Sequence, residues 1–326
     1  MKIANTILKR FENNINSLNN QVSNLRLKFS LRKKDLSQMY GETLFKIIEN
    51  SDPDLFAKTS PENVYQPAQL QNRKYFQSII EDLLLPGSEI ESDKNILEAQ
   101  RLAKQGKSVL ILSAHFSNFD VPVMYTLMKR HSIEMEKLFD DIVFIAGRKL
   151  TEGSKYVKAL AEMFSRLVIS AKANYKTAEE LHLALAINKA GQKKIAELKN
   201  SGRIFLIYPT GTRTRIDVPE TCNPMREIYN YLKKFDYFLC LGMKGNLLVP
   251  CDDRPMINEY PSKDKIKLNF GKVFQTDSFL NDIERGLPLA AIEDRKQAVM
   301  NLLMDQIYTL GDDPREQLRK TNIFAR

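Results

Sequence analysis

The sequence is poor in several residue types that would otherwise point to a particular class of protein. Its 326 residues include no tryptophan, three histidines and three cysteines. Cys222, Cys240 and Cys251 form neither a CxxC motif nor a metal-ligand cluster, so we predict no disulfide framework and no metal site. No segment approaches the roughly 20 apolar residues that a membrane-spanning helix needs, and residues 1–17 do not read as a signal peptide. We therefore expect a soluble, cytoplasmic protein.

The charge balance is positive. There are 49 lysines and arginines against 40 aspartates and glutamates, which gives a formal net charge of +9. This excess favours acidic partners, such as phosphorylated metabolites, an acidic carrier protein or an anionic membrane surface. The basic residues are scattered and form no stripe with interleaved aromatics, so we expect no nucleic-acid binding.

The first part of the chain has the pattern of amphipathic helices. Apolar residues recur every three or four positions over residues 3–29, 36–48 and 75–84, and the stretch "NSDPDLFAKTSPEN" after the second of these segments contains two prolines. This pattern predicts a small N-terminal helical bundle domain, residues 1–75, followed by a catalytic α/β domain, residues 76–326. We interpret the bundle stripes as packing surface rather than as a site of their own.

The remaining chain alternates short apolar strands with helices. The predicted strands are 107–113, 141–147, 166–170, 203–209, 237–243, 246–250 and 265–274. The predicted helices include 118–131, 154–164, one that Ser92 caps and Gly106 ends, one that starts with a capping box at Thr177 and Glu180, one from Pro224, and helices at the C-terminus. This alternation predicts an α/β fold with a mixed, mostly parallel central sheet covered by helices on both faces.

One strand end carries a candidate general base. His115 directly follows the strand 107–113, and Asp120 stands five positions later, where a helix is predicted to begin. A carboxylate there can accept the Nδ1–H of the imidazole, which leaves Nε2 free to take a proton. The spacing alone is weak evidence, because His131 and Glu136 repeat it in a predicted loop. Ser117 and Asn118 are better interpreted as helix caps.

Other strand ends carry cations. Arg148 and Lys149 follow one strand, Lys172 follows the next, and Arg213 and Arg215 stand in the loop "PTGTRTR". Ligands of open α/β sheets bind at the carboxyl ends of the strands, so these groups are expected to share a site with His115. The loop could be a simple solvated turn, but two arginines so close together favour phosphate binding, and Gly211 would let the backbone approach the ligand.

The ordered blocks "SAHFSNFD", "FIAGRKL", "VISAKAN" and "FLIYPTGTRTR" resemble those of the glycerolipid acyltransferases, with their His-x4-Asp motif. Their order and spacing are most similar to the soluble, chloroplast-type glycerol-3-phosphate 1-O-acyltransferases, from about residue 63 to residue 271. The resemblance implies transfer of an acyl group from acyl carrier protein or coenzyme A to glycerol-3-phosphate, the first step of phospholipid synthesis. It implies no other cofactor and no metal.

The resemblance also implies roles for individual residues. The catalytic histidine and aspartate fall on His115 and Asp120. The phosphate-binding residues fall on Lys172, Arg213 and Arg215, and we add Arg148, Lys149 and Gly211 as candidates. The sequence departs from the family pattern at four positions, where it has Ala114, Ala173, Thr210 and Cys240; the threonine matches the soluble type.

Two other functions stay open at this point. The acceptor could be another phosphorylated compound or a lysophospholipid. Alternatively, the protein could be a non-catalytic basic adaptor that binds acyl carrier protein or an anionic membrane through its helical bundle, an interpretation that the amphipathic first helix and the net charge suggest. Peripheral contact with a membrane is compatible with each of these functions, because the net charge is positive.

Overall fold

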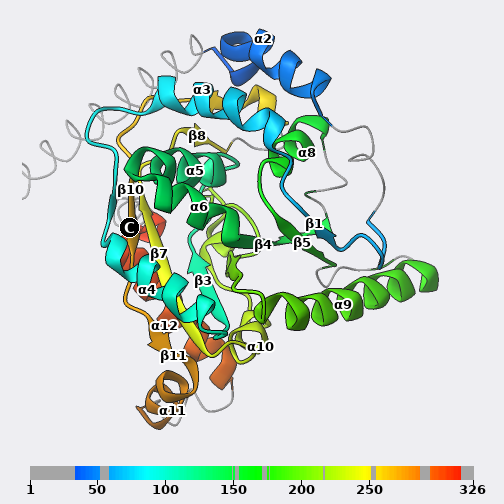
Figure 1. The fold of residues 1–326 in the computed structure, drawn as a ribbon, viewed down its shortest axis with the longest axis vertical. Coiled ribbons are helices and arrows are strands. Elements are labelled where there is room, and N and C mark those ends of the chain that lie inside the picture. The colour runs from blue at the N-terminus through cyan, green and yellow to red at the C-terminus, as the bar shows by residue number, and fades with distance from the viewer. Residues whose placement is uncertain are drawn as a thin grey trace, which may run out of the picture.

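The computed structural model describes residues 34–51, 59–148, 150, 154–170, 175, 177–215, 217–250, 255–286 and 294–316. The predicted helix over residues 3–29 lies outside these ranges. The central element of the described chain is a nine-stranded sheet (Figure 1). In sheet order, its strands are β1 (Tyr65–Gln66), β5 (Arg166–Ile169), β4 (Ile142–Gly147), β6 (Ile204–Ile207), β3 (Val109–Ser113), β7 (Tyr237–Lys244), β10 (Lys267–Phe270) and β2 (Glu89–Glu91), with β11 (Phe274–Gln275) beside β7.

The sheet is mixed and mostly parallel, as predicted. The five adjacent strands β5, β4, β6, β3 and β7 all run parallel, and β10 is parallel to β2. Antiparallel pairs occur where β1 meets β5 and where β10 and β11 meet β7. Every residue of β3 and β6 is buried, because their continuous apolar sequences, "VLILS" and "IFLI", are covered on both sides.

Helices pack against this sheet and against one another. They are α2 (Leu36–Glu49), α3 (Arg73–Leu83), α4 (Asp93–Lys104), α5 (Asp120–His131), α6 (Ile133–Asp141), α8 (Lys155–Glu162), α9 (Ala178–Lys199), α10 (Ile228–Leu232), α11 (Thr276–Gly286) and α12 (Arg295–Leu310), with 3-10 turns η2 (Leu70–Asn72), η3 (Pro219–Cys222) and η4 (Met256–Asn258). Helix α12 lies along β7, α4 contacts β3, β6 and β7, and α5 packs on α3 and α6. None of the described helices combines the length and the apolar character needed to cross a membrane. The predicted α/β fold is confirmed.

Helices α2 and α3 confirm two of the predicted N-terminal helices, and Figure 1 shows them together at one end of the molecule. Helix α3 buries Phe76, Ile79 and Ile80, and these residues belong to the same apolar core as the central strands. The predicted boundary after residue 75 falls inside α3. The division into two domains stays a prediction.

Several local predictions are wrong. The predicted strand 246–250 is reduced to β8 (Leu248–Val249), which pairs with β9 (Tyr260–Pro261) outside the central sheet. The predicted strand 265–274 is divided into β10, which ends at Phe270, and β11, which begins at Phe274. The helix expected from Pro224 begins only at Ile228, since the Met225 N–H donates to the Pro209 carbonyl instead.

Two predicted caps have different outcomes. Thr177 caps α9, and its hydroxyl accepts from the Glu180 N–H. Ser92 stands at the cap position of α4 but has a left-handed backbone (φ 56°) and makes no capping hydrogen bond with its side chain. The pair His131 and Glu136 does not lie in a loop, because His131 ends α5 and Glu136 belongs to α6.

Candidate active site

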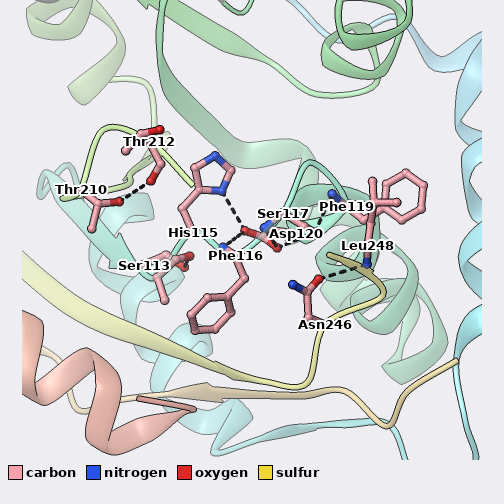
Figure 2. A network of polar contacts seen from close by, with 11 residues as sticks. Ser113, His115, Phe116, Ser117, Phe119, Asp120, Thr210, Thr212, Asn246 and Leu248 are labelled. Atoms are coloured by element: carbon pink, nitrogen blue, oxygen red, sulfur yellow. Dashed lines mark hydrogen bonds and ion pairs between the residues drawn. The ribbon is translucent and has the colours of Figure 1, made fainter. Parts of the chain in front are cut away.

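The predicted histidine–aspartate pair is formed at the carboxyl end of β3. His115 Nδ1 and Asp120 Oδ2 are 2.8 Å apart (Figure 2). Asp120 is the first residue of α5 and is buried, whereas the His115 side chain is 20 % exposed. Figure 2 shows the second ring nitrogen turned away from Asp120. With Nδ1–H donated to the carboxylate, Nε2 carries the free lone pair.

The Asp120 carboxylate is held by the backbone that leads into α5. Oδ2 also accepts from the Phe116 N–H at 2.7 Å, and Oδ1 accepts from the N–H and the hydroxyl of Ser117 at 3.0 and 3.1 Å (Figure 2). The Ser117 hydroxyl in turn accepts from the Phe119 N–H. Ser117 therefore orients the carboxylate, and the helix cap expected at Ser117 or Asn118 is Phe119 instead. Such fixed partners keep the imidazole in one orientation.

An aromatic ring covers one face of the imidazole. The ring of Tyr208, directly after β6, stacks on His115 with centroids 4.0 Å apart and planes 14° apart. The Tyr208 hydroxyl is buried and has no hydrogen-bond partner in the described part of the chain. Burial, and secondly the charge of Asp120, raise the pKa of this hydroxyl well above its usual value, so it stays protonated. No motif in the sequence marks Tyr208.

His115 lines a cavity of about 460 Å³. Its polar wall includes Ser117, Asn118 and Arg213 besides the imidazole. The remaining wall is largely apolar and comes from several elements, among them α5, β4, α8 and β6. It comprises Val121, Phe144, Ile145, Ala146, Leu150, Val157, Leu160, Phe164, Ile169, Ile207, Met225, Ile228, Pro255 and Met256. The cavity therefore suits an amphipathic ligand with a polar end near His115. No periodicity marks these apolar residues in the sequence, because they come from many elements.

The loop "PTGTRTR" brings Arg213 into this cavity. Its Nη1 lies 2.5 Å from Oε1 of Glu259, a fully buried carboxylate that no sequence motif marks. The Thr214 N–H donates to the His115 carbonyl at 2.7 Å, which ties the arginine loop to the histidine backbone. A guanidinium anchored in this way keeps N–H groups on its other edge that can bind an anion.

The other predicted phosphate-binding residues have different outcomes. Arg215 pairs with Asp217, with Nη2 and Oδ2 at 2.6 Å, and is not among the described residues that line the cavity. Arg148 follows Gly147, a cavity residue, and is partly exposed. Lys149 and Lys172 lie outside the described residues, so their place in the site stays a prediction.

Gly211 lines the cavity and has a left-handed backbone (φ +64°), as a glycine in a tight loop permits. A Cβ at this position would meet Met225 Cε at 2.6 Å. Its N–H donates to the Tyr208 carbonyl at 3.0 Å, so this group is committed to the turn. In the same loop, the Thr210 hydroxyl donates to the Thr212 carbonyl (Figure 2).

Ala114 and Cys240, two of the residues at which the sequence departs from the acyltransferase pattern, are both buried. Cys240 lies in β7, opposite Leu112 of β3, and burial raises the pKa of its thiol to about 12. A buried thiol with this pKa is not a nucleophile at neutral pH. Ala173 lies outside the described residues.

Comparison with known proteins agrees with this geometry. An acyltransferase family model matches residues 94–234, a segment that contains His115, Asp120, Tyr208 and Arg213. No curated protein sequence matches the chain. The class of protein is thus defined: the chain carries an acyltransferase domain. More particularly, this domain is similar to the acyltransferase family over residues 94–234.

Proposed function

We propose that this acyltransferase transfers a fatty acyl group from acyl carrier protein or coenzyme A to the sn-1 hydroxyl of glycerol-3-phosphate, forming 1-acyl-glycerol-3-phosphate. One observation carries the proposal: His115, Arg213 and a long apolar wall line the same cavity. A phosphate would bind the guanidinium, the acyl chain would lie on the apolar wall, and the reacting groups would meet at the imidazole.

The chemistry needs a base, because an alcohol is a weak nucleophile at neutral pH. His115 Nε2 takes the proton of the hydroxyl while its oxygen attacks the thioester carbonyl carbon. The tetrahedral intermediate then collapses, the carbon–sulfur bond breaks, and the thiolate leaves with the proton from the imidazolium. Asp120, 2.8 Å from Nδ1, stabilises the imidazolium between these two steps.

The phosphate group of the acceptor provides a handle that is remote from the reaction. Arg213 can bind its oxygens, and binding there holds the hydroxyl near Nε2. The Glu259 carboxylate, 2.5 Å from Nη1, fixes the direction of the guanidinium before the substrate arrives. Arg148, Lys149, Lys172 and Arg215 are proposed as further cations of the phosphate site.

His115→Ala tests the proposal. We expect kcat for acyl transfer to glycerol-3-phosphate to fall by about 10²- to 10⁴-fold, since general-base catalysis is lost. Release of thiol from acyl carrier protein or coenzyme A measures the rate, and calorimetry with glycerol-3-phosphate measures binding, which should persist.

His131→Ala is the matched control, because His131 also precedes an acid by five positions but ends a helix and contacts Asp93. It should keep the wild-type rate. A His115→Ala variant with near-normal turnover would remove His115 as the base. Wild-type protein that binds acyl carrier protein or anionic vesicles but releases no thiol with any donor would instead support the non-catalytic adaptor.

The second candidate differs only in the acceptor, a lysophospholipid or another phosphorylated alcohol. It is favoured by the apolar wall of the cavity, because an acyl chain of the acceptor could also lie against apolar side chains. One labelled acyl donor offered with glycerol-3-phosphate, a lysophospholipid and other phosphorylated alcohols in parallel separates the two candidates by their kcat/KM.

A further inference from the structure

The hydrogen bond to Asp120 does not by itself fix the plane of the His115 ring. It holds one atom, Nδ1, at one edge of the imidazole. Rotation about the Nδ1···Oδ2 direction would move Nε2 without breaking this bond. A contact on the face of the ring opposes that rotation, and the ring of Tyr208 supplies one, with centroids 4.0 Å apart and planes 14° apart.

Tyr208 itself is held firmly. It follows the buried strand β6 directly, and its ring packs against the apolar core. Its carbonyl accepts the Gly211 N–H, so the turn of the arginine loop begins at this residue. Both Tyr208 and His115 line the cavity. The Tyr208 ring is thus a fixed surface against one face of the imidazole.

The hydroxyl of Tyr208 does not explain why a tyrosine stands here. It is buried and makes no hydrogen bond within the described part of the chain. An unpaired buried hydroxyl is unfavourable for folding, so its presence confers no stability. The contribution of the residue lies in its ring.

We propose that Tyr208 is a positioning residue, whose stacked ring holds the plane of the His115 imidazole so that Nε2 faces the acceptor hydroxyl. The face of the ring also attracts positive charge, so the contact strengthens when His115 becomes an imidazolium during the reaction. Interactions that strengthen in the transition state raise kcat rather than lower KM. This inference rests on the proposed role of His115 as the general base.

Tyr208→Leu and Tyr208→Phe test the inference together. Phenylalanine keeps the stacking ring and removes only the unpaired hydroxyl, so we expect a kcat within about twofold of wild type and an equal or higher Tm. Leucine removes the ring face, and we expect kcat to fall about tenfold with the KM of both substrates unchanged. Thiol release measures both parameters, and thermal unfolding measures Tm.

Tyr65→Leu is the control for the loss of a core-packing tyrosine, because Tyr65 lies on the edge strand β1. It should leave kcat unchanged. If Tyr208→Leu does not fold, Tyr208→Met, which fills more of the space, replaces it with the same expected loss.

Wild-type kcat in the folded leucine or methionine variant would overturn the inference, as would an equal loss of kcat in Tyr208→Phe, which would assign the effect to the hydroxyl. An active His115→Ala variant would instead refute the proposed function. The two failures are therefore distinguishable.

Discussion

At the scale of single residues, the site depends on two anchored charges. Asp120 accepts four hydrogen bonds, from the His115 ring, the Phe116 N–H, and the N–H and hydroxyl of Ser117. Arg213 is anchored by Glu259. Asp120 and Glu259 are both buried, which limits the orientations that the His115 ring and the Arg213 guanidinium can adopt.

Arg213→Ala should raise the KM for glycerol-3-phosphate by about 10-fold or more, since a charge-assisted hydrogen bond contributes about 1.5–3 kcal/mol. The KM for the acyl donor should change less, and kcat for the bound acceptor should be largely retained. Initial rates at varied glycerol-3-phosphate measure the effect.

Arg226→Ala is a suitable control, because Arg226 forms an exposed ion pair with Asp294 and is not among the described residues of the cavity wall. An unchanged KM in Arg213→Ala would remove Arg213 from the phosphate site. Arg215→Ala in the same series measures the contribution of an arginine that already pairs with Asp217.

The sequence predicted the histidine–aspartate pair but not its surroundings. His115 and Asp120 could be found because five residues of separation bring them together at a strand-to-helix corner. Glu259 and Tyr208 carry no local signal of this kind. Glu259 reaches Arg213 across 46 positions of sequence, and Tyr208 reads only as the end of an apolar strand. Contacts of this range depend on the packing of the whole fold.

At the scale of elements, a buried polar cluster joins η2, α8 and β5. Asn72 Nδ2 donates to Glu162 Oε2 at 3.2 Å and to the Ile47 carbonyl of α2 at 3.0 Å. Arg166 donates to the Ala161 carbonyl, and burial lowers the pKa of its guanidinium to about 10, an effect that the charge of Glu162 partly offsets. The cluster therefore ties α2 and η2 to α8.

Glu162→Ala should lower the free energy of unfolding by about 3–5 kcal/mol, because it leaves the buried Arg166 without its compensating charge. Denaturant unfolding measures the loss. The exposed Glu197, which pairs with Lys194 on the surface of α9, provides the control, and its replacement by alanine should cost less than about 1 kcal/mol. Equal effects of the two substitutions would contradict this role for the cluster.

The strands and helices themselves were largely predictable. Continuous apolar runs gave β3, β4, β5, β6 and β7, because strands covered on both faces need apolar residues at every position. A prediction failed where a tertiary contact competes with local preference, as at Met225, whose N–H donates to the Pro209 carbonyl. Such partners are far away in sequence.

At the scale of the whole molecule, the excess of positive charge should make reactions with the two candidate acyl donors respond differently to salt. A net charge of +9 attracts an acidic carrier protein over a larger surface than it attracts the compact phosphates of coenzyme A. We therefore expect the KM for acyl carrier protein to rise more steeply with salt than the KM for acyl-coenzyme A. Raising the salt from about 0.1 M to about 1 M shortens the screening length from about 10 Å to about 3 Å.

Steady-state kinetics with both donors at several salt concentrations measures this difference. The dependence of KM for glycerol-3-phosphate on salt, recorded with each donor, is the internal control, because it reports screening at the phosphate site alone. Equal salt dependence for the two donors would contradict a preference based on long-range charge.

The hydrogen bond from the Thr214 N–H to the His115 carbonyl has a consequence for engineering. It joins the turn before α5 to the turn after β6, so a shift of one loop is expected to move the other. Replacing residues 208–215 alone, in order to alter the accepted alcohol, should also shift His115, because the Thr214 N–H donates to its carbonyl. Chimeras that transplant residues 113–120 and 208–215 as one unit should tolerate the exchange, whereas those that swap either half should not.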